Sequence, residues 1–173
     1  CVAAHCADGD SPKPPAPEHG PPDAHVNRLP TNKGVARETT RTRATLMGRL
    51  IRTRAQAALE MAAALDRGDH LGMLVDQHFS RGVDVTFFGR PCKANPTIAR
   101  LARRFDCPVV GVRVVRLPDR RHFRVMTEGP FDLPRDAAGQ IDVKAATQAI
   151  TDVVERWVRE NPGQYLWFHR RWR

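Results

Sequence analysis

The stretch PVVGVRVV, residues 108–115, is typical of a buried β-strand. It is rich in β-branched and apolar residues, which suit a strand inside a parallel sheet. HFRVMTEG, residues 122–129, alternates apolar and polar residues and suits a neighbouring strand. Upstream, HLGMLV at residues 70–75 and VDVTFF at residues 83–88 are two further runs of strand length, the second followed by a turn at Gly89-Arg90-Pro91. These four runs predict the sheet of the protein.

Three helices are predicted between and after these strands. Residues 54–66, RAQAALEMAAALD, are rich in good helix formers. Asn95-Pro96 opens a second helix over residues 96–105. Asp142 caps a third helix, which ends at Asn161-Pro162-Gly163. Strands that alternate with helices predict an α/β fold with a mostly parallel sheet flanked by helices.

The first 40 residues differ from the rest of the chain in composition. Seven of the 14 prolines fall within residues 1–34, which have almost no apolar periodicity. Proline at this density forbids helix interiors and removes hydrogen-bond donors from strands. We therefore predict an atypical or poorly ordered Pro-rich segment over residues 1–40 and a globular domain over residues 41–173. Because the first residue is Cys1 and not Met, we expect the chain to be a fragment that lacks its N-terminus.

The chain of 173 residues is strongly basic, with 28 Lys+Arg against 19 Asp+Glu and a formal net charge of +9. Such a surface favours anionic partners, which are nucleic acid, an anionic bilayer, or an acidic protein or phosphorylated substrate. No run approaches the roughly 20 apolar residues of a membrane span. The four cysteines form no Cys-x-x-Cys pair, so the sequence indicates neither a zinc site nor a disulfide framework. We expect reduced thiols and no metal.

Asp76 is the first candidate for a functional residue. It follows the apolar run LGMLV, and α/β folds bind ligands at the carboxyl edge of their sheets. An aspartate after a strand is also an ordinary turn residue. Position alone leaves both interpretations open for Asp76 and for its neighbour Gln77.

The C-terminal segment QYLWFHRRWR, residues 164–173, mixes aromatic and cationic side chains. Aromatic bodies with cationic heads suit the headgroup layer of a bilayer. They also suit stacking on nucleic-acid bases between phosphate contacts. A third interpretation is an edge element whose aromatic side chains complete the core.

Five segments in order carry a resemblance to a known family: LGMLVDQ, VTFFGRP, IARLARRF, CPVVGVRVVR and YLWFHRRWR. Together they resemble the C-terminal half of the lauroyl/myristoyl acyltransferases of lipid A biosynthesis, from about residue 46 to residue 173. The resemblance implies a glycerol-3-phosphate-acyltransferase-like α/β fold. It also implies transfer of a fatty acyl chain from acyl carrier protein to a lipid A precursor in lipopolysaccharide biosynthesis, without a cofactor.

The same resemblance implies partners and a location. The partners are acyl carrier protein as acyl donor, the lipid A precursor and the anionic surface of the inner membrane, whereas nucleic acid is not expected. The location is the cytoplasmic face of the cell inner membrane, with the family's N-terminal membrane helix not present in this chain.

The resemblance further implies a His-x4-Asp/Glu site, and His5 and Asp10 have this spacing. In this chemistry the histidine takes a proton from the attacking hydroxyl, and the carboxylate fixes the tautomer of the histidine. Asp76 matches the family's functional aspartate, with Gln77 beside it. The substrate-binding candidates implied elsewhere in the chain are Arg43, which shares its region with Arg41, and the C-terminal pair Arg170 and Arg171.

Two other functions remain open at this point. The chain could be an inactive remnant of that enzyme, which keeps the fold and has lost the histidine motif. It could also be a basic nucleic-acid-binding module, which its charge and its aromatic-basic tail would suit. The second alternative has no RNA- or DNA-binding signature in the sequence.

Overall fold

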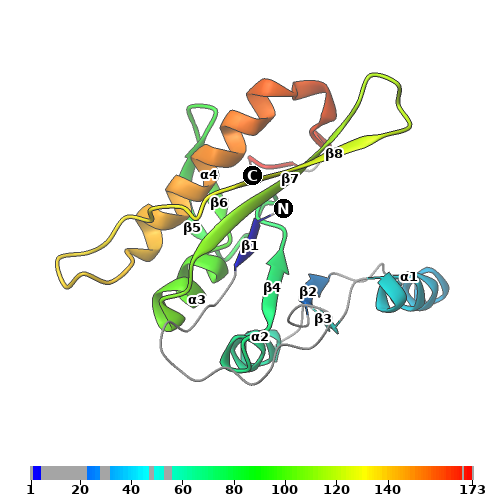
Figure 1. The fold of residues 1–173 in the computed structure, drawn as a ribbon. Coiled ribbons are helices and arrows are strands. Elements are labelled where there is room, and N and C mark those ends of the chain that lie inside the picture. Colours follow the sequence, from blue (N-terminus) through cyan, green and yellow to red (C-terminus); the bar gives the residue numbers. More distant parts are fainter. Residues whose placement is uncertain are drawn as a thin grey trace.

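The computed structural model of the chain describes residues 2–4, 23–27, 32–46, 49–52, 56–168 and 170–172. The strands are β1 (Val2–Ala4), β2 (Asp23–Asn27), β3 (Arg49–Arg52), β4 (His70–Met73), β5 (Val83–Phe87), β6 (Arg90–Ala94), β7 (Val109–Arg116) and β8 (Phe123–Glu128). The helices are α1 (Lys33–Leu46), α2 (Ala57–Asp66), α3 (Thr97–Phe105) and α4 (Val143–Glu160), followed by the 3-10 turn η1 (Pro162–Gln164). Figure 1 shows their arrangement.

Six of the strands form one sheet in the order β3-β2-β4-β1-β7-β8. β2 pairs in parallel with β3 and with β4, whereas β1 pairs antiparallel with β4 and β7, and β7 pairs antiparallel with β8. The α/β class is confirmed. The prediction of a mostly parallel sheet is wrong for strand pairing, because three of the five neighbouring pairs in the described sheet are antiparallel. One physical reason is that β8 returns from β7 through a short loop, which only antiparallel neighbours permit.

Helices α2, α3 and α4 pack against one face of this sheet. Leu71 and Met73 share a face of β4, because side chains two residues apart along a strand point the same way. Leu71 is buried with Met61 of α2. Met73 is buried with Ile98 of α3 and Ile150 of α4. Apolar residues at helical spacing thus face the sheet in α3 and α4, whereas in α2 Ala57 is buried and Ala58 is exposed.

β5 and β6 form a separate antiparallel hairpin that packs against α4. Its two turn residues, Phe88 and Gly89, have positive φ angles of 52° and 70°, which is the geometry of a tight hairpin turn. The sequence places Arg90 and Pro91 in a turn, but the structure places both in β6. Phe87 is fully buried, as expected of a core residue.

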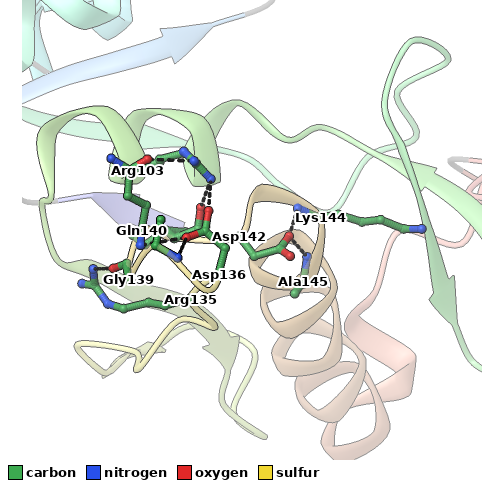
Figure 2. Close-up of polar contacts among 10 residues, drawn as sticks. Arg103, Arg135, Asp136, Gly139, Gln140, Asp142, Lys144 and Ala145 are labelled. Carbon is green, nitrogen blue, oxygen red and sulfur yellow. Dashed lines mark hydrogen bonds and ion pairs between the residues drawn. The ribbon is translucent and has the colours of Figure 1, made fainter.

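Arg103 of α3 fixes the loop that joins β8 to α4 (Figure 2). Its Nη1 donates to Oδ2 of Asp136 and to the carbonyl oxygen of Ile141, both at 2.8 Å. Its Nη2 donates to Oε1 of Gln140 at 2.7 Å. These contacts hold the start of α4 against the end of α3.

Asp142 begins α4 as its N-terminal cap. Its Oδ1 accepts hydrogen bonds from the backbone N–H groups of Lys144 and Ala145 at 2.9 and 3.0 Å (Figure 2). These bonds satisfy two of the N–H groups that a helix leaves unpaired at its start. The predicted cap at Asp142 is confirmed, and α4 ends at Glu160, just before Asn161.

Folded elements begin before residue 41. The predicted boundary between residues 40 and 41 falls inside α1, and β2 lies within the six-stranded sheet. The prediction of an atypical or poorly ordered segment over residues 1–40 stays a prediction, although β1, β2 and the start of α1 fall within it. Its reasoning rested on the prolines, and the sequence from 23 to 27, DAHVN, contains none.

Candidate functional site

The loop that follows β4 lies at the carboxyl edge of the sheet. β4 and β7 each pair antiparallel with β1, so they run in the same direction and their carboxyl ends meet at this edge. After Met73 ends β4, Val75 is buried and Asp76 is half-buried. An apolar side chain followed by a carboxylate thus anchors the loop to the core and brings the charge to the edge.

Asp76 is one of the residues that line a small cavity of about 160 Å³. Its Oδ1 is buried and has no hydrogen-bond partner among the residues that the structure describes. A buried carboxylate oxygen without a donor is costly, so this atom calls for a hydrogen-bond donor that the described residues do not supply. Polar side chains of Asn161, Gln164 and Tyr165 also line this space.

Arg113 of β7 brings a positive charge to the same cavity. Its Nη1 lies 2.5 Å from Oε2 of Glu160 at the end of α4, and its guanidinium lies 5.4 Å from the ring centroid of Trp157. A carboxylate, a guanidinium and side-chain amides together suit hydroxyl or anionic groups of a ligand. The apolar remainder of the lining comes from Val75, Val114, Val115, Val154, Trp157 and Val158.

Residues from the C-terminal segment close over the Asp76 loop. The hydroxyl of Tyr165 donates to the carbonyl oxygen of Asp76 at 3.1 Å. Burial raises the pKa of Tyr165 above its ordinary value, with the charge of Arg171 acting in the opposite direction. Tyr165 is therefore a neutral hydrogen-bond donor at physiological pH.

Arg171 is not a surface cation. Arg171 is only 1% exposed, and its Nη1 donates to the carbonyl oxygen of Gln77 at 2.7 Å. Of the two substrate-binding candidates in this segment, Arg171 is therefore buried against the Asp76 loop, whereas Arg170 is exposed. Tyr165 and Trp172 are half-buried and pack against the core, as the edge-element interpretation of this segment expects, whereas Trp167 is 47% exposed.

A larger groove of about 870 Å³ adjoins the cavity. It lies between the β7–β8 hairpin and the segment after α4, and it shares Val114, Val115, Asn161 and Gln164 with the smaller cavity. Gln164 joins the two sides of the groove, because its side chain exchanges two hydrogen bonds with the backbone of Arg116 at 2.8 and 3.1 Å. The groove has the dimensions of a ligand site that opens to solvent.

The other predicted site residues lie outside this cluster or outside the described part of the chain. His5 and Asp10 fall outside the described residues. Arg43 lies in α1, and its side chain is not among those described. Of the predicted set, the structure brings together Asp76, Gln77 and Arg171, and Gln77 takes part through its backbone carbonyl.

Side chains that could bind a metal do not cluster in the described residues. They contain no group of three or more His, Cys, Asp or Glu side chains that could hold a metal ion. Cys92 and Cys107 are buried free thiols. Among the described helices, none is both long and apolar enough to cross a bilayer.

Sequence reasoning missed Arg113, Asn161 and Gln164 as residues of the site. Arg113 carries a signal, because it is the one charge inside the apolar strand PVVGVRVV. Asn161 and Gln164 carry none, because Asn161-Pro162-Gly163 is a common way to end a helix. Only the return of the chain after α4 places them beside β7.

Comparison with known proteins identifies the family of the chain. A comparison with curated proteins found no match. A family model described as bacterial lipid A biosynthesis acyltransferase matches residues 16–173. The match covers nearly the whole chain, including β2, both cavities and the C-terminal segment. The chain therefore belongs to the bacterial lipid A biosynthesis acyltransferase family.

Proposed function

We propose that this protein transfers a fatty acyl chain from acyl carrier protein to a hydroxyl group of a lipid A precursor, in lipopolysaccharide biosynthesis. Family membership supports acyl transfer in lipid A synthesis. The observation that carries the site is the buried Oδ1 of Asp76, which has no partner among the described residues, in a residue that lines the same cavity as Arg113. The finer fold assignment, a variant of the glycerol-3-phosphate-acyltransferase-like fold, belongs to the same proposal.

The proposed reaction needs proton transfer and no redox chemistry. The O–H bond of the acceptor breaks as its oxygen bonds to the thioester carbonyl carbon. The C–S bond then breaks, and the thiol of the carrier leaves with a proton. A general base whose pKa lies near the working pH accelerates the first step. His5, with Asp10 to fix its tautomer, has the spacing for that base, but β1 runs antiparallel to β4 and its last residue, Ala4, pairs with Leu71, so β1 ends at the sheet edge opposite the Asp76 loop.

Asp76 and Arg113 have complementary tasks in this proposal. The free carboxylate oxygen of Asp76 accepts a hydrogen bond from the acceptor sugar or from a cationic group of the site, and so orients the attacking hydroxyl. Arg113 lines the same cavity and supplies a positive charge for phosphate or for the developing oxyanion. Its ion pair with Glu160 holds the guanidinium in place.

The net charge of the chain and its exposed side chains support the proposed partners. The net charge of +9 favours acyl carrier protein, which is acidic, and the phosphates of the lipid. We place the protein at the cytoplasmic face of the inner membrane. Support comes from the β7–β8 hairpin, where the exposed apolar side chains of Val114, Phe123 and Val125 share a face with Arg116.

Acyl transfer from labelled acyl carrier protein to a lipid A precursor tests the proposal. Product that requires the donor, the acceptor and this protein is the expected result. Thioester hydrolysis without product would contradict transfer. Failure of the chain to react, with the fold intact, would favour an inactive remnant. Tight binding of single-stranded RNA without any reaction would favour the nucleic-acid-binding alternative.

A further inference from the structure

We infer that Arg171 is a positioning residue for Asp76, and that the C-terminal segment serves to hold the loop that carries this carboxylate. The inference rests on the proposed function, in which Asp76 contacts the substrate. It assigns to Arg171 a task inside the protein, in place of the substrate contact expected from its sequence. Hydrogen bonds between the C-terminal segment and the Asp76 loop carry it.

The guanidinium of Arg171 donates hydrogen bonds to the loop on both sides of Asp76. Its Nη1 lies 2.7 Å from the carbonyl oxygen of Gln77 and 3.4 Å from that of Val75. These two carbonyl groups flank Asp76 in the chain. Charge-assisted hydrogen bonds are stronger than those between neutral groups, so a single side chain fixes the backbone before and after the carboxylate.

The loop also holds Arg171 in return. The Nδ1–H of His78 donates to the carbonyl oxygen of Arg171 at 3.2 Å. The guanidinium lies 5.1 Å from the ring centroid of Phe87, and the next residue, Trp172, donates from Nε1 to the carbonyl oxygen of Phe87 at 3.0 Å. Both the backbone and the side chain of Arg171 are thus fixed, which limits the movement of the Asp76 loop relative to the core.

Tyr165 adds a further contact from the same segment. Its hydroxyl donates to the carbonyl oxygen of Asp76 itself at 3.1 Å. Three consecutive carbonyl groups, those of Val75, Asp76 and Gln77, therefore accept hydrogen bonds from the C-terminal segment. A loop with this many long-range anchors presents its side chain in a defined direction, which catalysis by orientation requires.

The cost of burying Arg171 argues for a positioning role. Its Nε and Nη2 are buried without a hydrogen-bond partner, and no carboxylate within the described part of the chain forms an ion pair with it. A buried cation without a carboxylate partner is a poor choice for stability alone. Costly polar groups of this kind concentrate at functional sites.

A double-mutant cycle between Arg171 and Asp76 tests the inference. Arg171→Met keeps an unbranched side chain and removes the donors, and Asp76→Asn removes the carboxylate charge. We expect Arg171→Met to lower kcat about tenfold with little change in KM, because the loss falls on the orientation of the reacting groups. In the Asp76→Asn background the same change should lower kcat by less than about twofold. The loss of thermal stability should be the same in both backgrounds.

Arg171→Lys provides a second variant for the case in which Arg171→Met does not fold, and it should recover part of kcat by donating to Gln77. Arg100→Met, on the exposed surface of α3, is the control and should leave kcat unchanged. Equal factors lost in both backgrounds would overturn the inference, since a purely structural role lowers both rates alike. Full activity of Asp76→Asn would instead remove Asp76 from the site and so overturn the proposed function on which the inference rests.

Discussion

The indole Nε1 of Trp157 donates a hydrogen bond to Oε2 of Glu128 at 3.0 Å, and this bond ties α4 to β8. The guanidinium of Arg156 holds the other carboxylate oxygen of Glu128. These donors, Arg156 first, lower the pKa of the Glu128 carboxyl below its ordinary value of 4.5. β8 is the outer strand of the sheet, so this carboxylate helps to keep the β7–β8 hairpin against the rest of the fold.

Glu128→Gln should destabilise the protein in a pH-dependent way. Because the folded state lowers the pKa, the carboxylate adds stability above pH 4.5, and this stability is lost as the pH falls through the lower folded value. The side chain is 41% exposed, so we expect about 1 kcal/mol or less near neutrality. Urea denaturation of both proteins across pH 3 to 7 measures the difference in the free energy of unfolding. The unfolding free energy of a small protein falls by roughly 1–3 kcal/mol per molar urea. A stability difference that grows toward acid pH would contradict this account.

Asp142→Ala should weaken the start of α4. The substitution removes the acceptor for the N–H groups of Lys144 and Ala145 and should cost about 1 kcal/mol. Asp142→Asn is the matched control, because an amide oxygen can still accept these bonds and should retain most of the stability. The free energy of unfolding of the two variants decides the matter. Equal losses would show that the charge of Asp142, and not its cap, stabilises the helix.

Local signals explain which elements the sequence predicts correctly. The strand at 108–115 and the cap at Asp142 depend on neighbouring residues alone, and both are found in the structure, the strand as β7. β6 was missed because Pro91 is a poor strand residue, and it is tolerated there only as part of a two-stranded hairpin. The antiparallel place of β1 between β4 and β7 has no local signal at all.

Long-range contacts explain what the sequence misses in the site. Arg171 and Gln77 lie 94 residues apart, and an arginine in an aromatic-basic tail is more often exposed than buried. The place of Asp76 at the edge of the sheet could be predicted, because it follows an apolar strand. The cavity that Asp76 lines depends on residues of β7 and of the segment after α4, which come together only in the fold.

The β7–β8 hairpin should contribute to membrane binding. Arg120 and Arg124 are exposed and form no ion pair within the described residues. Changing both to Gln should weaken partition onto phosphatidylglycerol-containing vesicles roughly thirtyfold, at about 1 kcal/mol for each charge near an anionic surface. Arg100→Gln with Arg104→Gln on α3 removes the same charge elsewhere. Equal losses from both pairs, measured by vesicle sedimentation, would argue against a specific role of the hairpin.

Binding of acyl carrier protein should weaken as salt rises. The basic surface of the chain attracts an acidic partner over a distance that salt shortens, from about 10 Å at 0.1 M to about 3 Å at 1 M. Titration of the carrier protein at increasing sodium chloride measures the effect. An affinity that does not change with salt would count against charge as the basis of recognition.

The central claim is that the Asp76 carboxylate acts on the substrate, and Asp76→Asn tests it most directly. The substitution keeps the size and most hydrogen-bonding capacity of the side chain and removes its charge. The rate of acyl transfer and the Tm should be measured side by side on the wild-type and variant proteins. We predict that transfer falls by at least about tenfold, or roughly 1.4 kcal/mol of transition-state stabilisation, while stability changes by no more than about 0.5 kcal/mol. Normal transfer by Asp76→Asn would contradict the claim, and lost transfer with a large fall in Tm would make Asp76 a structural residue of the loop.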